Sequence, residues 1–215
     1  MAFKSALQFL PDNIKADLSD LCGIDEVGRG CWAGPLVASA FRLYEDIKIT
    51  ALKDSKQLTK ERREEVFAIL SKARDEGKCA FGVGISKVAE IDNLGVIRAN
   101  NLAFVRALEE MGSSPKFLLV DGRDKLQLPY PHKTVIKGDE KIKIIACASI
   151  IAKVTRDKMM CELALKYPNY GFELHKGYGT QQHQNALNEY GITPIHRRHY
   201  KPVYMTMQAL LPFGD

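Results

Sequence analysis

The sequence lacks any apolar run that approaches the length of a membrane-spanning helix. Because such a helix needs about 20 mostly apolar residues, no transmembrane helix is expected. A signal peptide is not expected either, since Pro11 and Asp12 interrupt the short apolar stretch near the N-terminus. The 5 cysteines are widely separated and form no Cys-x-x-Cys pair. This argues against a zinc site or a disulfide framework, so we expect reduced thiols and a cytoplasmic protein.

Internal repeats and low-complexity linkers are also missing. The 215 residues, 46% of them hydrophobic, suffice for one domain with a core, or for one domain with an appendage. The net charge of +5 permits a polyanionic partner without requiring one. Basic residues, histidines and tyrosines gather between His175 and Lys201, where Glu189 is the only acid. This local charge suits a phosphate backbone, with a solvated basic face as the alternative.

The hydrophobic pattern predicts helices and strands along most of the chain. Apolar residues at roughly helical spacing in the range 1–20 predict a short amphipathic helix. Strands are expected at 21–27, 35–43, 78–86, 117–120 and 134–136, with a tight turn joining the first two as antiparallel neighbours. Longer helices are expected at 60–76, 88–111, 142–166 and 181–190. This order of elements indicates a mixed sheet with helices on its faces.

Carboxylates stand where three of the predicted strands end. Asp25 and Glu26 close the first strand, Asp121 ends the fourth, and Asp139 follows the fifth. A mixed sheet can bring strand ends together at one edge, where ligand sites collect. Four converging acids would repel one another without cations, and two divalent ions about 4 Å apart can promote hydrolysis of a phosphodiester. For any one acid alone, a cap or turn role is the alternative.

A glycine-rich turn follows the first two acids. Gly28-Arg29-Gly30 can supply a turn and let the backbone approach a ligand closely. On a regular strand, Asp25 and Glu26 would point to opposite faces. The alternative for the whole stretch is a solvated strand end with a glycine turn.

Six blocks of the sequence, in order, resemble bacterial ribonuclease HII, the type 2 ribonuclease H. Each block alone is a weak match, whereas the ordered set is specific and covers about residues 21–203. The blocks are Gly23–Gly30, Asp54–Leu58, Leu119–Gly122, Lys137–Asp139 with Ala146–Asp157, His175–Thr180, and His196–Arg198.

The resemblance implies a fold and a division of the chain. The fold would be α/β, a ribonuclease H-like mixed five-stranded sheet flanked by helices, with a C-terminal helical appendage. Residues 1–20 would be an N-terminal extension outside the resemblance. Residues 21–215 would form the catalytic domain, with the C-terminal helical segment beginning at about residue 168.

The resemblance also implies a reaction. The protein would be a metal-dependent endoribonuclease that hydrolyses RNA in RNA–DNA hybrids. It would also incise 5′ to ribonucleotides embedded in duplex DNA, leaving 5′-phosphate and 3′-hydroxyl ends, for ribonucleotide removal. Four acids would be the catalytic residues and the ligands of Mg²⁺ or Mn²⁺ at a two-metal site: Asp25, Glu26, Asp121 and Asp139.

Substrate contacts are implied at three further places. Gly28, Arg29 and Gly30 would read the 2′-hydroxyl through their backbone, since that hydroxyl separates RNA from DNA. Tyr178 would stack on the sugar beyond the junction, and Lys56 would contact a phosphate.

Few positions depart from the family pattern, and none of them is an implied metal ligand. Trp32 is a large ring beside the glycine turn and could alter the substrate fit. His183 and His196 could contact phosphates or be locally hydrogen-bonded.

Two other functions remain open. One is a ribonuclease HIII-like hybrid nuclease, which carries a sizeable N-terminal domain that the roughly 20 residues before the first strand do not supply. The other is a non-catalytic nucleic-acid-binding module on the same fold, which would need broken acids. The expected partner is the nucleic acid substrate, with no membrane, no required protein partner and a monomeric chain.

Overall fold

The computed structural model describes residues 3–49 and 58–210, and its centre is a five-stranded mixed sheet. The strands are β1 (Leu21–Val27), β2 (Leu36–Leu43), β3 (Cys79–Ser86), β4 (Phe117–Asp121) and β5 (His132–Val135). Their order in the sheet is β3-β2-β1-β4-β5. The β1–β2 and β2–β3 pairs are antiparallel, whereas β1–β4 and β4–β5 are parallel. This confirms the expected mixed sheet.

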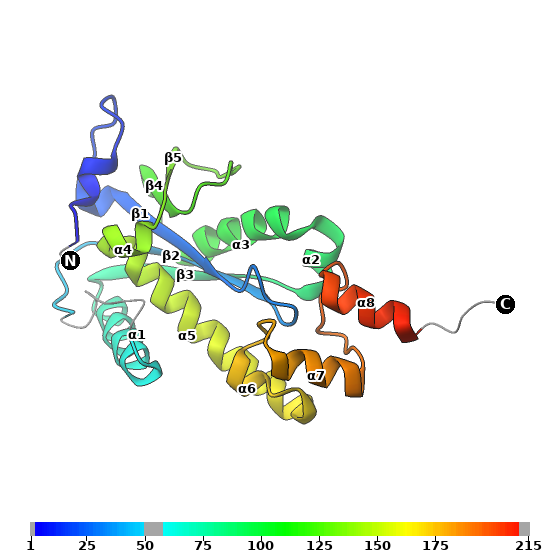
Figure 1. The fold of residues 1–215 in the computed structure, drawn as a ribbon. Helices are drawn as coiled ribbons and strands as arrows, with labels where there is room; N and C mark the ends of the chain where they lie inside the picture. The colour runs from blue at the N-terminus through cyan, green and yellow to red at the C-terminus, as the bar shows by residue number, and fades with distance from the viewer. Residues whose placement is uncertain (1–2, 50–57, 211–215) are drawn as a thin grey trace.

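Helices cover both faces of the sheet (Figure 1). They are α1 (Lys60–Asp75), α2 (Val88–Leu94), α3 (Val96–Met111), α4 (Gly138–Lys141), α5 (Lys143–Lys166), α6 (Phe172–His175), α7 (Gln181–Tyr190) and α8 (Lys201–Leu210). Thr59 caps α1 by accepting a hydrogen bond from the backbone N of Arg62 at 3.3 Å, as expected. Within residues 3–49 and 58–210, no helix combines the length and apolarity that a membrane crossing requires.

Alternation along the strands divides the apolar core into two layers. On β4, Phe117 and Leu119 face the layer that contains α1 and α5, whereas Leu118 and Val120 face the layer that contains α3. All four side chains are buried, because helices cover both faces. The continuous apolar run at 117–120 follows from this double burial.

Gly23 lets α5 lie directly on β1. A Cβ at this position would overlap the backbone of Ile144, near the start of α5. The close approach brings the middle of α5 beside the carboxyl end of β1, where the first acids stand.

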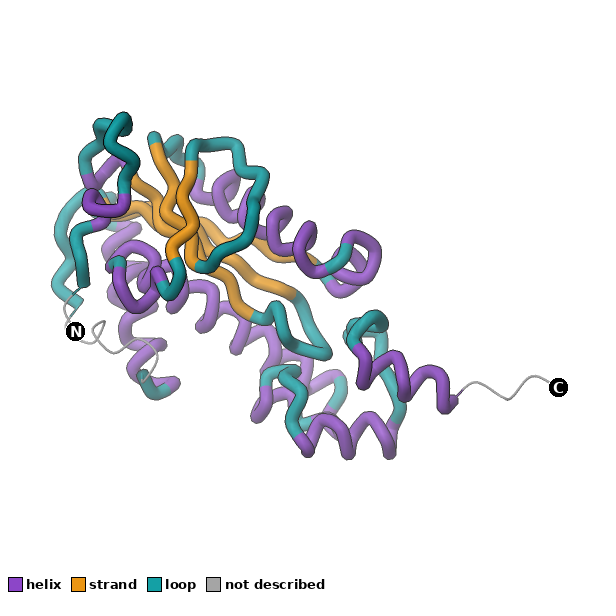
Figure 2. Tube along the Cα trace, turned by 45° about the horizontal axis from the view of Figure 1, so that its top comes forward, coloured by secondary structure: helices purple, strands orange, loops and turns teal. Residues whose placement is uncertain are grey.

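The C-terminal segment forms a third layer beyond one end of the sheet. In Figure 2 the last helices stand beside the loop that joins β1 and β2. That loop spans 28–35 and is longer than the tight turn expected. Its Ala33 packs in a small core with Met160, Tyr170 and Phe172, which ties the loop to α5 and to the chain after it.

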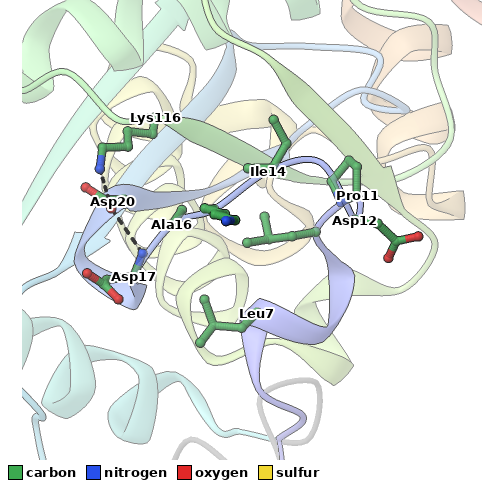
Figure 3. A pocket seen from close by; sticks show the side chains of 10 residues that line it. Leu7, Pro11, Asp12, Ile14, Ala16, Asp17, Asp20 and Lys116 are labelled. Atoms are coloured by element: carbon green, nitrogen blue, oxygen red, sulfur yellow. Dashed lines mark hydrogen bonds and ion pairs between the residues drawn. The ribbon is translucent and has the colours of Figure 1, made fainter.

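In place of the expected amphipathic helix, residues 3–20 contain two short 3₁₀ helices, Ala6–Phe9 and Leu18–Asp20. Pro11 lies between them and has no N–H for a continuous helix. The segment borders a groove of about 560 Å³ at the amino ends of β1 and β4, where Lys116 pairs with Asp20 at 3.0 Å (Figure 3). The division at residue 20 into extension and catalytic domain stays a prediction.

Candidate active site

The four acids expected at strand ends line one cavity at the carboxyl edge of the parallel strands. Its volume is about 450 Å³. Ile24 on β1 and Val120 on β4 are paired neighbours, so the residues that follow them, Asp25 and Asp121, lie side by side at this edge. The full lining is Asp25, Glu26, Arg63, Asp121, Lys137, Asp139, Ser149, Ile150, Lys153 and Tyr178.

Local hydrogen bonds hold two of the carboxylates. The Oδ1 atom of Asp25 accepts from the backbone N of Glu26 at 2.8 Å. The Oδ1 atom of Asp121 accepts from the backbone N of Gly138 at 2.5 Å. The second bond joins the end of β4 to the start of α4, so it sets the position of the segment that carries Asp139.

The placement of Asp139 differs from the expectation. This residue lies in the first turn of the short helix α4 and not at the end of a strand. The helix begins after Lys137, whose φ of 55° is in the left-handed region. That sharp change of direction after β5 turns the buried side chain of Asp139 back into the cavity.

Arg29 binds two acids at the mouth of the cavity. Its Nη1 atom lies 3.3 Å from Glu26 Oε1 and 2.6 Å from Asp124 Oδ2. The guanidinium is therefore engaged with protein carboxylates.

Burial and like charges disfavour ionisation of the first two acids. Burial raises the pKa of Asp25 well above its usual value, and the charges of Glu26 and Asp121 raise it further, against a hydrogen bond from Ser149. Burial likewise raises the pKa of Glu26 to about 7, with Arg29 acting in the opposite direction. A bound cation would favour the charged forms of both.

The chemistry of these donors fits a hard divalent cation. All four acids offer oxygen ligands, which Mg²⁺ and Mn²⁺ prefer. Asp25 and Asp139 are buried and the other two are partly buried, so their charges together call for a counter-ion. In the part of the chain that the structure describes, no group of three or more His, Cys, Asp and Glu side chains is already arranged around a metal position. Glu26 accepts a hydrogen bond from Arg29 at 3.3 Å, so one of its carboxylate oxygens is already engaged.

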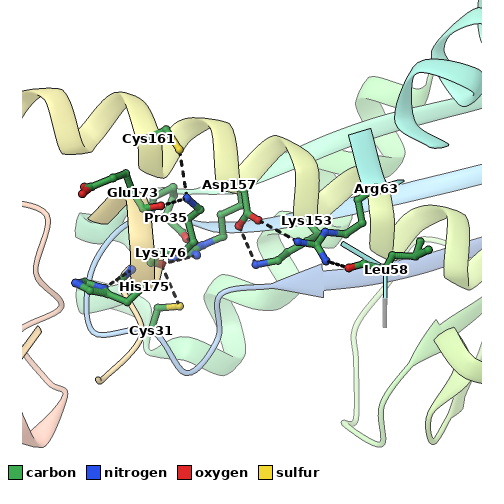
Figure 4. A network of polar contacts seen from close by, with 12 residues as sticks. Cys31, Pro35, Leu58, Arg63, Lys153, Asp157, Cys161, Glu173, His175 and Lys176 are labelled. Atoms are coloured by element: carbon green, nitrogen blue, oxygen red, sulfur yellow. Dashed lines mark hydrogen bonds and ion pairs between the residues drawn. The ribbon is translucent and has the colours of Figure 1, made fainter. Parts of the chain in front are cut away.

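Three cations also line the cavity, and sequence reasoning did not identify them: Arg63, Lys137 and Lys153. Asp157 on α5 restrains two of them, since its carboxylate lies 2.8 Å from Lys153 Nζ and 4.0 Å from Arg63 Nη2 (Figure 4). A polar stripe at four-residue intervals on an otherwise apolar helix, Ser149, Lys153 and Asp157, was the available signal.

The glycine turn and Tyr178 lie at the same cavity edge. Gly28 has a φ of 95°, and a Cβ there would overlap the side chain of Arg156. Gly30 is exposed and has open space around it. Tyr178 is 39% exposed, with Lys153 Nζ 5.9 Å from the centre of its ring. Lys56 lies outside the described residues.

Part of the expected basic surface is interior. His183 and His196 are buried and lie 3.0 Å apart through their Nε2 atoms, so they are locally hydrogen-bonded and do not face a phosphate. Arg197 is buried as well, while Arg198 remains exposed. The ring of Trp32 packs against that of His183, with 5.3 Å between the ring centroids. Trp32 is therefore part of the same interior cluster as the two histidines.

Comparison with known proteins gives one consistent family. The family model described as ribonuclease HII matches residues 22–203. The ribonuclease HII of Bacillus licheniformis is 47% identical over 85% of this chain and 70% of its own length. Among solved structures, the ribonuclease HII in the PCNA complex from Archaeoglobus fulgidus has a TM-score of 0.70 at 25% identity, covering 86% of this chain and 96% of its own. The Bst ribonuclease HIII in complex with Mn²⁺ shares the fold, with a TM-score of 0.62 at 18% identity over 88% of this chain and 69% of its own.

Proposed function

This chain belongs to the ribonuclease HII family, and from that premise we propose how its carboxylate cavity cleaves RNA. Family membership makes it a type 2 ribonuclease H, an endonuclease for RNA–DNA hybrids. The finer proposal is metal-dependent incision 5′ to a ribonucleotide in duplex DNA, leaving 5′-phosphate and 3′-hydroxyl ends. The observation that carries it is the meeting of four acids and three cations in one cavity beside the glycine turn.

The proposed metal ligands and catalytic residues are the four acids Asp25, Glu26, Asp121 and Asp139. Two Mg²⁺ or Mn²⁺ ions, when bound, would activate a water and stabilise the leaving oxygen. The Mn²⁺ bound by Bst ribonuclease HIII, which has the same fold, supports this choice of ion.

The chain's own residues prepare the site for an anionic substrate. The backbone N of Gly138 orients Asp121, so one carboxylate oxygen is fixed and the other faces the cavity. Lys153, Lys137 and Arg63 supply positive charge for the phosphates on either side of the cleaved bond. Lys56 is proposed as a further phosphate contact.

Recognition of the ribonucleotide is assigned to the glycine turn and to Tyr178. Gly28, Arg29 and Gly30 would contact the 2′-hydroxyl through their backbone, and the open space around Gly30 supports a close approach. The ring of Tyr178 would stack on the neighbouring sugar, where its partial exposure leaves one face available.

The direct test uses a DNA duplex that contains one ribonucleotide, incubated with the purified chain and Mg²⁺ or Mn²⁺. We expect a single incision 5′ to that ribonucleotide, with the ends mapped by mass spectrometry. Asp121→Asn should lower the rate by about 100- to 1,000-fold, the range found when one preorganised electrostatic group is removed from a catalytic site. Asp75→Asn is the matched control, because the Asp75 side chain is 74% exposed at the end of α1.

Two results would contradict the proposal. One is an absence of cutting at the ribonucleotide, with cutting retained only on longer RNA tracts. The other is an Asp121→Asn variant that keeps the wild-type rate.

The incision rate of the purified chain alone also tests whether cleavage needs a protein partner. The Archaeoglobus fulgidus protein was solved with PCNA. For this chain we propose a cytoplasmic enzyme, active as a monomer, that needs no protein partner for incision. A rate that rises only when a second protein is added would contradict this.

A further inference from the structure

Two buried arginines lie behind the glycine turn. Arg156 on α5 and Arg197 after α7 each have 0% of their surface exposed. Among the described residues, no carboxylate lies within 4.0 Å of either guanidinium. A buried charge is strongly unfavourable unless its hydrogen-bonding groups are satisfied. The atoms that accept hydrogen bonds from these two guanidiniums therefore indicate what the arginines hold in place.

Arg156 joins the β1–β2 loop to the loop that carries Tyr178. Its Nε atom donates to the carbonyl of Pro35 at 2.8 Å, and its Nη2 atom donates to the carbonyl of Ala33 at 3.1 Å. Its Nη1 atom donates to the carbonyl of Lys176 at 2.8 Å, two residues before Tyr178. One guanidinium thus links two segments that are far apart in the sequence.

Arg197 holds the glycine turn itself. Its Nη1 atom donates to the carbonyl of Arg29 at 3.0 Å, in the centre of the turn. Its Nε and Nη2 atoms both donate to the carbonyl of Gly34, at 3.0 and 2.9 Å. The hydroxyl of Tyr200 contacts Arg197 Nη1 at 3.2 Å and donates to the same Arg29 carbonyl. Arg197 therefore binds the β1–β2 loop at two places: at the centre of the glycine turn, and at Gly34 near the start of β2.

The backbone of the loop is shaped around these side chains. Gly28 and Gly34 have φ values of 95° and 84°, and a Cβ at Gly28 would overlap the side chain of Arg156. Trp32 N also donates to the carbonyl of Gly177 at 2.8 Å. The loop, the two guanidiniums and the Tyr178 segment thus form one hydrogen-bonded unit.

We propose that Arg156 and Arg197 are positioning residues that hold the Gly28–Gly30 turn and Tyr178 at a fixed separation, so that both engage the same ribonucleotide. The inference rests on the proposed function of the turn and of Tyr178. It follows from where the hydrogen bonds go. One acceptor, the carbonyl of Arg29, lies in the turn itself, and another, the carbonyl of Lys176, lies two residues before Tyr178. The remaining acceptors lie at residues 33–35, in the loop that continues from the turn. Recognition of a single hydroxyl by a backbone turn requires such fixed geometry.

The test measures binding of two duplexes that differ only in one 2′-hydroxyl, in an Asp121→Asn background with Mg²⁺ present. Arg156→Lys and Arg197→Lys keep the charge and lose the planar fork of donors. The ratio of affinities for the ribonucleotide-containing and all-DNA duplexes should fall about tenfold, since a ~1 Å misplacement can be worth about 100-fold. Affinity for the all-DNA duplex should change less than about twofold, because the phosphate contacts persist.

Arg42→Lys is the matched control. Arg42 is also buried and donates through two nitrogens to one backbone carbonyl, that of Ser19, but it lies at the opposite end of β2. This variant should lower the melting temperature and leave the affinity ratio unchanged. An equal fall of the ratio in Arg42→Lys would indicate general loosening and overturn the inference.

Other outcomes are equally decisive. Folded Lys variants that keep the parent ratio would overturn the inference. If those variants do not fold, Tyr200→Phe removes one hydroxyl from the same unit, and it should lower the ratio by a smaller factor; an unchanged ratio overturns the inference. A parent protein without any preference for the 2′-hydroxyl would instead overturn the proposed function, and the inference with it.

Discussion

Asp157 shows how one buried side chain can organise a substrate site without facing the reaction. Its carboxylate lies 2.8 Å from Lys153 Nζ and 4.0 Å from Arg63 Nη2, and both cations line the acid cavity. Without this partner, Lys153 could turn toward the four acids and neutralise them. Arg63 would keep its hydrogen bond to the carbonyl of Leu58 at 2.6 Å but would lose its contact with a carboxylate. The ion pairs therefore keep the positive and negative parts of the site separate.

Replacing Asp157 with Asn should raise KM about three- to tenfold with little change in kcat. The reason is that the cations would lose their restraint while the proposed metal ligands stay in place. Steady-state kinetics on the single-ribonucleotide duplex measure this, with Glu162→Gln on the exposed side of α5 as the control. A variant with unchanged KM and a collapsed kcat would contradict this role.

The buried histidines predict a loss of stability in mild acid. Burial lowers the pKa of His183 to about 4 and that of His196 to about 3. Both are therefore neutral in the folded state, whereas the unfolded chain takes up protons below about pH 6.5. The free energy of unfolding should fall as the pH drops from about 6.5 toward 4.

Urea unfolding at pH 7 and pH 5 measures this loss, which should reach a few kcal/mol because each pKa unit is worth about 1.4 kcal/mol. Asp25 and Glu26 have raised pKa values and contribute with the opposite sign. The measurement therefore uses an Asp25→Asn/Glu26→Gln background. Stability that is flat or rises between pH 7 and pH 5 in this background would exclude neutral, buried histidines.

At the scale of elements, glycines on two strands set how closely the helices approach. Gly23 on β1 faces the backbone of α5, and Gly84 on β3 faces the backbone of α3. Only the first of these contacts lies beside the acid cavity, because α5 carries Ser149 and Lys153. Substitution of each glycine should therefore lower stability, but only substitution of Gly23 should also affect the acid cavity.

Gly23→Ala and Gly84→Ala should each destabilise the fold by about 1–3 kcal/mol, the usual range for overpacking. Gly23→Ala should also lower kcat/KM of the folded protein, because α5 would move away from β1. Gly84→Ala should leave kcat/KM within about twofold of the wild-type value, since α3 does not line the cavity. Thermal unfolding and kinetics at a temperature where both variants are folded give the comparison. Equal kinetic losses in both variants would refute the local role of Gly23.

Elements with a strong hydrophobic pattern were predictable from the sequence, whereas a four-residue helix and a buried basic segment were not. The helix at 143–166 and the buried strand at 117–121 agree with their predicted ranges within a residue. Helix α4 has only four residues, too few for a period, so Asp139 was expected at a strand end. The basic segment around Arg197 was expected on the surface, because a sequence does not show that backbone carbonyls can satisfy a buried charge.

For the whole molecule, charge is distributed unevenly between the substrate site and the rest. The net charge is only +5, yet Arg63, Lys137 and Lys153 line the one cavity that holds the four acids. Binding of a nucleic acid should therefore depend on a small number of ionic contacts at this edge.

Lys153→Gln should reduce the slope of log affinity against log salt concentration by about one, the effect of losing one phosphate contact. Lys72→Gln should leave the slope unchanged, since the Lys72 side chain is 80% exposed on α1 and pairs with Glu76 on the same helix. Filter binding of the all-DNA duplex between low and moderate salt measures both slopes. Equal slopes for wild type and Lys153→Gln would remove Lys153 from the phosphate contacts.

The hydrogen bond from Arg197 to the carbonyl of Arg29 spans 168 residues of sequence. During synthesis on the ribosome, Asp25, Glu26 and the glycine turn emerge first, and their buried guanidinium partners emerge much later. A nascent chain that stops before Arg197 carries all four acids but lacks the side chain that closes the turn. A chain of that length would therefore lack part of the proposed means of recognising the 2′-hydroxyl, although every proposed metal ligand is already present.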